Sequence, residues 1–153
     1  MKFFLFTITL LFTLNSCAQS TLKFVNPSSV ATPKGYSQTA QIDLGNATML
    51  LIAGQVPLDK QGNLIGKDDF EKQTTQVFSN IKNIIEAAGG NMNHLAKITI
   101  FIKDVGKIQV VREVRDKFIN TQTPPASTLV EVSNLYRSDV MIEIEATAVI
   151  PKK

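Results

Sequence analysis

Cysteine, histidine and tryptophan are scarce in this chain of 153 residues, which contains one Cys, one His and no Trp. A single cysteine cannot form an internal disulfide, and one Cys with one His cannot build a Cys/His zinc site, so we expect no metal. Six Pro and eight Gly are too few for a collagen-like or low-complexity chain. A formal net charge of +3 gives little support for a nucleic-acid partner. The composition of the whole chain, with 44% hydrophobic and 19% charged residues, is typical of one globular domain.

The N-terminus departs from this average composition. It reads MKFFLFTITLLFTLNSC, in which Lys2 precedes an apolar run from Phe3 to Leu14. The run is short for a membrane-spanning helix and is typical of the apolar part of a signal peptide. The end of the segment, LNSC, resembles a bacterial lipobox, although Asn15 departs from the usual small residue. We therefore predict a signal peptide at 1–16, a lipid on Cys17, export to the cell envelope and a membrane anchor through that lipid.

Two other interpretations of this segment stay open. Ser16-Cys17-Ala18 also fits a small-x-small cleavage site, which would give a soluble exported protein. Alternatively, the segment is a buried strand with a core cysteine, and the protein is then cytoplasmic. Cleavage before Cys17 leaves 137 residues, which can bury about two-thirds of their unfolded surface without disulfides or metal.

The rest of the chain alternates between strand and helix patterns. Residues 17–34 are rich in Ser, Thr and Pro and are predicted to be a tether with a possible edge strand at Thr21–Val25. Residues 35–153 are predicted to form the domain, with strands at 49–53, 96–103, 127–133 and 140–150 and helices at 68–88 and 107–119. This order predicts an α+β domain in which both helices cover one face of a sheet and the other face meets solvent or a partner.

The first predicted helix has signals at both ends. Asp68 with Glu71 three residues later resembles a capping box, which predicts Asp68 as the N-cap. Gly89-Gly90 ends the apolar periodicity, as expected for a left-handed C-terminal cap.

Carboxylates lie on the last predicted strand. Alternation places Glu143 and Glu145 on one face and the apolar residues on the other. On the preceding strand, Glu131 shares a face with Ser127 and Leu129. These carboxylates either line a cleft on the uncovered face, where one orients a water, or simply form the wet face of a two-sided sheet.

Four segments, in this order and spacing, resemble motifs of the Rid/YjgF family of reactive-intermediate deaminases. They are Gly35-Tyr36-Ser37-Gln38, Ala53-Gly54-Gln55-Val56-Pro57, Pro125-Ala126-Ser127-Thr128-Leu129-Val130-Glu131-Val132 and Ile142-Glu143-Ile144-Glu145-Ala146. The resemblance covers about residues 22–151. It implies a chorismate-mutase-like (YjgF-like) α+β fold and a homotrimer with clefts between subunits around a central barrel. It also implies a cofactor-free enzyme that hydrolyses small 2-imino or enamine acids to 2-keto acids and ammonia.

The resemblance assigns roles to some of these residues. Glu143 matches the glutamate that positions the attacking water, and Tyr36 matches a tyrosine beside the substrate. Gly54 matches a turn glycine, and Ala53 stands where serine is common.

Other positions depart from the family pattern. Ser127 occupies the position of the arginine that binds the substrate carboxylate, Leu129 stands where cysteine is frequent, and Arg112 falls where active members often carry asparagine. A serine donates one neutral hydrogen bond where a guanidinium donates two charge-assisted ones. Losing such a pair costs about 2–5 kcal/mol, so we expect altered or reduced deaminase activity.

An arginine from a neighbouring subunit could replace the missing one. Arg112, Arg115 and Arg137 are the candidates, unless all three are solvated surface residues. The leading hypothesis is an imine or enamine hydrolase. The alternatives are a non-catalytic trimer that binds a small ligand and a scaffold for a protein partner at the envelope. The single histidine, His94, is expected to be a surface or capping residue.

Overall fold

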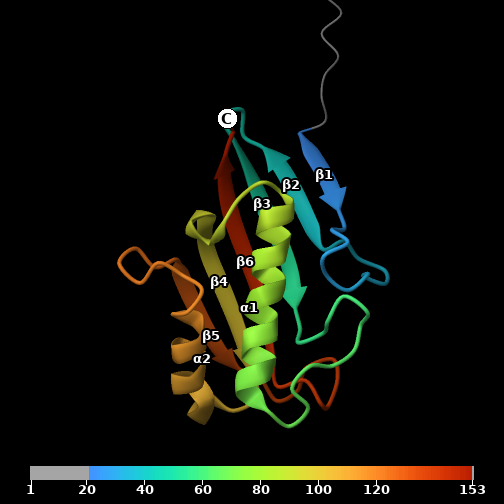
Figure 1. The fold of residues 1–153 in the computed structure, drawn as a ribbon, viewed down its shortest axis with the longest axis vertical. Coiled ribbons are helices and arrows are strands. Elements are labelled where there is room, and N and C mark those ends of the chain that lie inside the picture. Colours follow the sequence, from blue (N-terminus) through green and yellow to red (C-terminus); the bar gives the residue numbers. More distant parts are fainter. Residues whose placement is uncertain (1–20, 153) are drawn as a thin grey trace, which may run out of the picture.

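The computed structural model describes residues 21–152, and the predicted signal peptide and Cys17 lie outside this range. One sheet and two helices make up the domain (Figure 1). The strands are β1 (Leu22–Val25), β2 (Thr39–Asp43), β3 (Ala47–Gln55), β4 (Leu95–Ile102), β5 (Ala126–Glu131) and β6 (Ile142–Pro151). The helices are α1 (Phe70–Ala87) and α2 (Ile108–Arg115), with short 3₁₀ turns η1 (Met92–His94) and η2 (Val105–Lys107).

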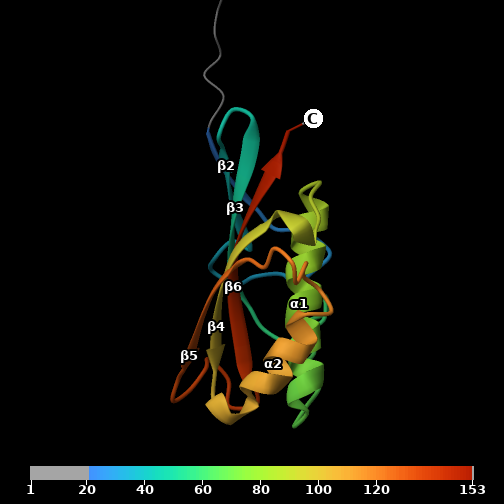
Figure 2. The ribbon, with the colours of Figure 1, turned by 90° about the vertical axis from the view of Figure 1, so that its left-hand side faces the viewer.

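The strand order in the sheet is β1-β2-β3-β6-β4-β5. All neighbours are antiparallel except β4 and β5, which are parallel and are connected through α2. Both helices lie on the same face of the sheet, which Figure 2 shows edge-on. The predicted α+β class, the edge strand at the N-terminus and the helix-covered face are therefore confirmed.

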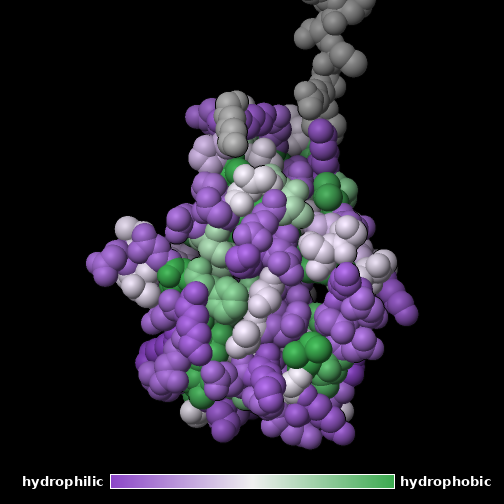
Figure 3. All heavy atoms as spheres, viewed as in Figure 1, coloured by the Kyte–Doolittle hydropathy of each residue, from purple (hydrophilic) through white to green (hydrophobic). Residues whose placement is uncertain are grey.

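The core lies between this face and the helices. Ile98, Ile100 and Ile102 of β4 are buried, and Ile142 and Ile144 of β6 pack beside them, as the alternation predicts. On the helix side, Phe78 of α1 stacks on Phe118, with ring centroids 5.5 Å apart. The outer surface of this side is mostly hydrophilic (Figure 3). No helix in residues 21–152 is long and apolar enough to cross a membrane.

Besides small shifts at the ends of the predicted strands, three details differ from the sequence prediction. Strand β2 was not predicted, because its sequence TAQID has no clear alternation. Helix α2 ends at Arg115 and not at Ile119, since Lys117 and Phe118 donate i→i−3 hydrogen bonds that tighten the chain into a turn. The N-cap of α1 is Asp69, whose side chain accepts a hydrogen bond from the Lys72 N–H.

The prediction of Asp68 as N-cap was therefore wrong by one residue. Asp68 instead has a positive φ of 58° and turns the chain into the helix. At the other end, Gly89 has φ of 85°, which confirms the predicted left-handed cap.

Candidate functional site

A pocket of about 830 Å³ opens beside the ends of β3 and β6. It brings together Tyr36, Ala53, Gly54 and Glu143, four of the residues that the motifs singled out. The remaining lining residues are Ala31, Thr32, Lys34, Val56, Leu58, Lys60, Gln61, Gly62, Tyr136 and Arg137. The walls therefore come from three stretches of chain that are far apart in sequence.

A bulge in β3 shapes the floor of this pocket. Ile52 pairs with Ala146 and Gln55 with Ile144, so two residues of β3, Ala53 and Gly54, face a single residue of β6. The Glu143 carboxyl lies directly over Gly54, because a Cβ built on Gly54 would overlap Oε1 of Glu143 and lie 2.9 Å from its Cδ. Only glycine allows this approach without displacing the carboxyl.

Two buried glutamines hold the bulge and the Tyr36 loop together. Gln55 Nε2 donates to Gln38 Oε1 at 2.7 Å and to the Ala53 carbonyl at 2.9 Å. Gln38 Nε2 donates to the Ala31 carbonyl at 2.8 Å, and its own carbonyl accepts from the Ala53 N–H at 3.0 Å. The glutamines belong to motifs used for the family resemblance, but their structural role did not follow from the sequence pattern.

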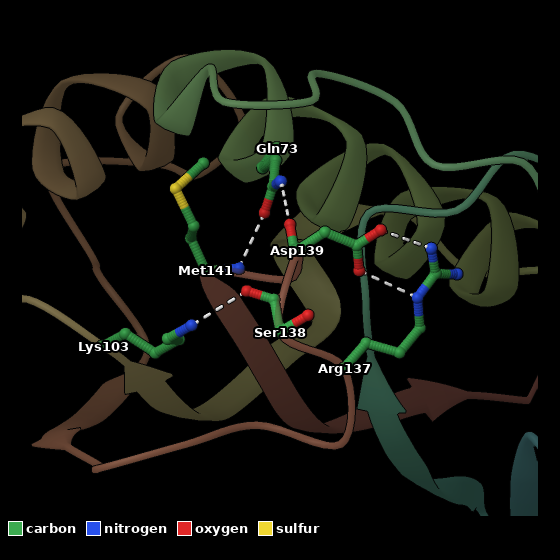
Figure 4. Close-up of polar contacts among 6 residues, drawn as sticks. All are labelled: Gln73, Lys103, Arg137, Ser138, Asp139 and Met141. Atoms are coloured by element: carbon green, nitrogen blue, oxygen red, sulfur yellow. Dashed lines mark hydrogen bonds and ion pairs between the residues drawn. The ribbon is translucent and has the colours of Figure 1, made fainter.

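Helix α1 anchors the other rims of the pocket through buried amides. Asn80 Nδ2 donates to the Val56 and Leu58 carbonyls at 3.0 Å each. Gln73 Nε2 donates to the Asp139 carbonyl and Gln73 Oε1 accepts from the Met141 N–H, both at 2.8 Å (Figure 4). Sequence reasoning missed both residues. The available signal was a polar side chain on an otherwise apolar face, and such a residue needs a buried partner.

Glu143 and Tyr36, which both line the pocket, have raised pKa values. Burial raises the pKa of Glu143, and the neighbouring Glu145 carboxylate raises it further. Burial also raises the pKa of the Tyr36 hydroxyl, with smaller contributions from Tyr136 and Glu143. Perturbed groups that converge in one pocket are the usual mark of a functional site.

Arg137 lies in the same pocket, in the loop before β6. Its Nε and Nη2 pair with the two carboxyl oxygens of Asp139 at 2.9 and 2.6 Å. Lys103 Nζ donates to the Ser138 carbonyl at 3.0 Å and ties the loop to the end of β4 (Figure 4). Tyr136 was not singled out from the sequence, although the chain has only two tyrosines and both line this pocket.

Three predicted site residues are not among those that line the pocket. Ser127 and Leu129 lie opposite the buried Ile98 and Ile100 in the parallel β4–β5 pair, and so on the helix-covered side of the sheet. Arg112 is exposed on α2. Within one chain, the predicted site is therefore divided between the pocket and the β5–α2 edge.

Glu131 and Arg115 also make their contacts with residues that do not line the pocket. Glu131 Oε2 accepts from the Val105 N–H, and Arg115 pairs with Asp116 at 2.8 Å. The interpretation that Glu131 shares a cleft with Glu143 is therefore not supported by the contacts. His94 Nδ1 accepts from the Asn91 N–H at 3.0 Å in a capping box, as expected for a capping residue.

The face of the sheet opposite the helices carries exposed apolar side chains. Phe24 is 66% exposed, Leu51 43% and Val130 42%. Phe24 and Leu51 also border a second, shallower hollow of about 460 Å³ with Glu145 and Lys97. This face therefore has the character of a surface that a partner covers.

Comparison with known proteins agrees with the fold and the motifs. The family model described as Endoribonuclease L-PSP matches residues 27–150. A RutC family protein of Pyrococcus horikoshii is 44% identical over 113 residues, which are 74% of this chain and 85% of that protein. The 2-iminobutanoate/2-iminopropanoate deaminase of Salmonella typhimurium is 37% identical over 110 residues, 71% of this chain and 83% of the enzyme.

A solved structure leads to the same family. The crystal structure of the YjgF gene product of Escherichia coli superposes with a TM-score of 0.70 at 35% identity, covering 83% of this chain and 98% of that one. The sequence match extends over most of the described residues, and the fold matches as well. The chain therefore belongs to the Endoribonuclease L-PSP family, also called the YjgF/RutC/Rid family, as its four motifs predicted.

Proposed function

We propose that this protein hydrolyses small 2-imino or enamine acids to 2-keto acids and ammonia, with a substrate preference or rate altered by Ser127. The observation that carries the proposal is the position of the Glu143 carboxyl over Gly54, in a pocket that Tyr36 also lines. Relatives from Salmonella typhimurium and Escherichia coli, each 37% identical, are named 2-iminobutanoate/2-iminopropanoate deaminases.

The proposed role of Glu143 is to take a proton from water and to give it to the nitrogen of the substrate. Its carboxylate accepts a proton as a water oxygen bonds to C2 of the imine, and the C=N bond becomes a C–N single bond. The same carboxyl then gives that proton to the nitrogen, which completes a carbinolamine with a hydroxyl and an amine on C2. The carboxylate next takes the proton of the C2 hydroxyl and passes it to the amine, so that the C–N bond breaks, ammonia leaves and C2 becomes a ketone. A glutamate with a raised pKa is suited to both steps, because general acid–base catalysis works best when the pKa approaches the working pH.

The proposal includes a homotrimer. Proteins of this family are commonly homotrimers, and the exposed apolar side chains Phe24, Leu51 and Val130 give this chain a surface that a second subunit would bury. In such an assembly, Ser127, Leu129 and Arg112 of one subunit would face the pocket of the next and complete a ligand site. A two-part site of this kind would explain why one chain holds only four of the seven predicted residues in its pocket.

The proposal also includes export and a lipid anchor at Cys17. It is supported by the apolar run that ends in LNSC, and by the fact that Cys17 is the sole cysteine of the chain. Mass spectrometry of the protein from a membrane fraction tests it, because lipidation adds acyl mass to a peptide that begins at Cys17. An unmodified peptide that begins at Gln19, after the Ser16-Cys17-Ala18 site, would instead indicate soluble export, and an intact Met1 peptide would rule out processing.

A second function is a non-catalytic trimer that binds a small ligand. It is favoured by Ser127, because a serine hydroxyl cannot replace the two charge-assisted hydrogen bonds of an arginine. A scaffold for an envelope partner is a further alternative, consistent with the predicted location.

One experiment separates turnover from binding. An amino-acid oxidase generates 2-iminobutanoate in the assay, and we measure the ammonia and 2-oxobutanoate released by the purified full chain above the spontaneous rate. The hydrolase proposal predicts acceleration that Glu143→Gln abolishes. Ser127→Arg should increase the rate if the rest of the site is intact. No acceleration by the wild-type protein or by the Ser127→Arg variant would favour the binding module.

A further inference from the structure

The pocket carries more positive than negative charge at its walls. Lys34, Lys60 and Arg137 line it, and Glu143 is its one lining carboxylate. Arg137 is the sole arginine among the lining residues, since the other two lie on α2. A pocket with this charge balance attracts a small anion.

Arg137 is held in a fixed position. Its bidentate pair with Asp139 involves Nε and Nη2, and the Asp139 carbonyl in turn accepts from Gln73, which is fully buried (Figure 4). The Met141 N–H, two residues further along, donates to the same glutamine. The guanidinium is thus connected to the core by a continuous set of hydrogen bonds, so little conformational freedom is lost when it binds a ligand.

The pair with Asp139 uses only two of the three nitrogens of the Arg137 guanidinium. A guanidinium has five N–H groups, and the Asp139 carboxylate occupies only the Nε side of the fork. The interactions with Asp139 and then with the Tyr136 hydroxyl raise the pKa of Arg137, so its positive charge is permanent. The two N–H groups of Nη1 point away from Asp139 (Figure 4). They can bind one carboxylate while the pair with Asp139 stays intact.

We propose that Arg137 binds the carboxylate of the ligand in this pocket, with Asp139 and Gln73 as positioning residues. This replaces the missing arginine at position 127 with one from the loop before β6, in the same subunit as Glu143. The inference rests on the proposed function for the ligand class, a 2-imino or 2-keto monocarboxylate. It does not require that turnover occurs.

The test measures binding of 2-oxobutanoate, the product of the proposed reaction, to the full chain by isothermal titration calorimetry. We expect Arg137→Gln to weaken binding about ten-fold or more, because a hydrogen bond to a charged group contributes about 1.5–3 kcal/mol. Arg137→Lys should give an intermediate loss, because it keeps the charge but not the fork. Asp139→Asn should also weaken binding, since it releases the guanidinium from its fixed position.

The matched control is Lys152→Gln. Lys152 is also an ion-paired cation, bound to Asp43 at 2.7 Å far from the pocket, and its loss should leave binding unchanged. Thermal melting of each variant checks folding. If Arg137→Gln does not fold, the affinity of Arg137→Lys is compared with that of the wild type instead. Equal affinity of wild type and Arg137→Gln, or no binding by wild type at millimolar ligand, would overturn the inference.

The two proposals fail in different ways. Arg137-dependent binding without ammonia release supports the role of Arg137 and refutes the hydrolase. Ammonia release with the same KM in wild type and Arg137→Gln supports the hydrolase and refutes the role of Arg137.

Discussion

Replacing Gly54 by alanine tests whether the Glu143 carboxyl needs its place over the bulge of β3. Gly54 does not have a positive φ, so alanine can adopt its backbone conformation. The added Cβ would lie 2.9 Å from Glu143 Cδ and 3.1 Å from Cγ and would overlap Oε1. Carbon atoms in contact are separated by about 3.5–4.0 Å, so the carboxyl must move by about 1 Å.

The expected effects on stability and on chemistry are very different. The clash involves the end of a flexible side chain, and Gly→Ala stabilises by about 0.4–1 kcal/mol through the unfolded state. We therefore expect the free energy of unfolding to change by less than about 1 kcal/mol. A displacement of 1 Å in a catalytic group costs about 100-fold in rate. Turnover of 2-iminobutanoate should fall by this factor in a protein that remains folded.

The assay combines ammonia release, thermal unfolding and an NMR titration of the Glu143 carboxyl carbon. The NMR signal needs no turnover, and it should show a pKa nearer the ordinary glutamate value as the carboxyl moves out of its buried position. The control is a double-mutant cycle with Glu143→Gln, because two changes that act through one carboxyl are not additive. A Gly54→Ala protein with wild-type rate and an unchanged Glu143 titration would refute the geometry. Fully additive losses would show that Gly54 acts through something other than Glu143.

Three other predictions concern the stability of the fold around Glu143, at the Gln38–Gln55 pair and at the start of α1. The pKa of Glu143 is raised in the folded protein. The protonated carboxyl therefore stabilises the folded state at pH values below the pKa of the unfolded chain, and this stabilisation is lost as the pH rises through the pKa of the folded protein. Glu143→Gln should therefore raise the melting temperature relative to wild type at pH 7 but not at pH 4, and an equal difference at both pH values would contradict the burial of the carboxyl. Gln55→Leu removes the donor to Gln38 Oε1 in a buried pair and should cost about 1–3 kcal/mol of unfolding free energy; urea denaturation measures it, and a loss below the error of the method would mean that water replaces the bond. Asp69→Ala removes the N-cap of α1 and should cost about 1 kcal/mol. Asp68→Gly should instead stabilise, since glycine adopts the positive φ without strain. The opposite order of these two melting temperatures would restore Asp68 as the cap.

The parts of the fold that the sequence predicted are those in which burial is periodic. The buried apolar residues of β6 alternate along the strand and face the helices, and α1 repeats its apolar residues along one stripe that faces the sheet. Strand β2 was missed because its residues are neither alternating nor strongly apolar, and it forms through pairing with β1 and β3. The N-cap was misplaced by one residue because Asp68 and Asp69 carry the same side chain, and only the backbone conformation distinguishes them.

The site was predictable in its residues but not in its construction. The motifs named Tyr36, Gly54 and Glu143, which do share a pocket. They gave no indication of the bulge, because a bulge arises from the register between β3 and β6. Nor could they indicate Gln73, whose amide is buried only because the loop before β6 supplies a carbonyl and an N–H.

Apart from Ala53, which lies in the pocket itself, the departures from the family pattern lie on β5 and α2, and this bears on how they act. Ser127, Leu129 and Arg112 lie on β5 and α2, whereas the bulge and the Glu143 carboxyl are maintained by separate contacts within β3, β6 and the Gln38–Gln55 pair. A substitution on β5 therefore leaves the geometry around Glu143 unchanged. If the proposed function is correct, serine at position 127 changes the contacts of the ligand and leaves the position of the Glu143 carboxyl unaltered. A ligand carboxylate held from the loop before β6 instead of from β5 would lie on a different side of Glu143. The preferred substrate should consequently differ from that of a family member that keeps the arginine, even though both present the same carboxyl to water.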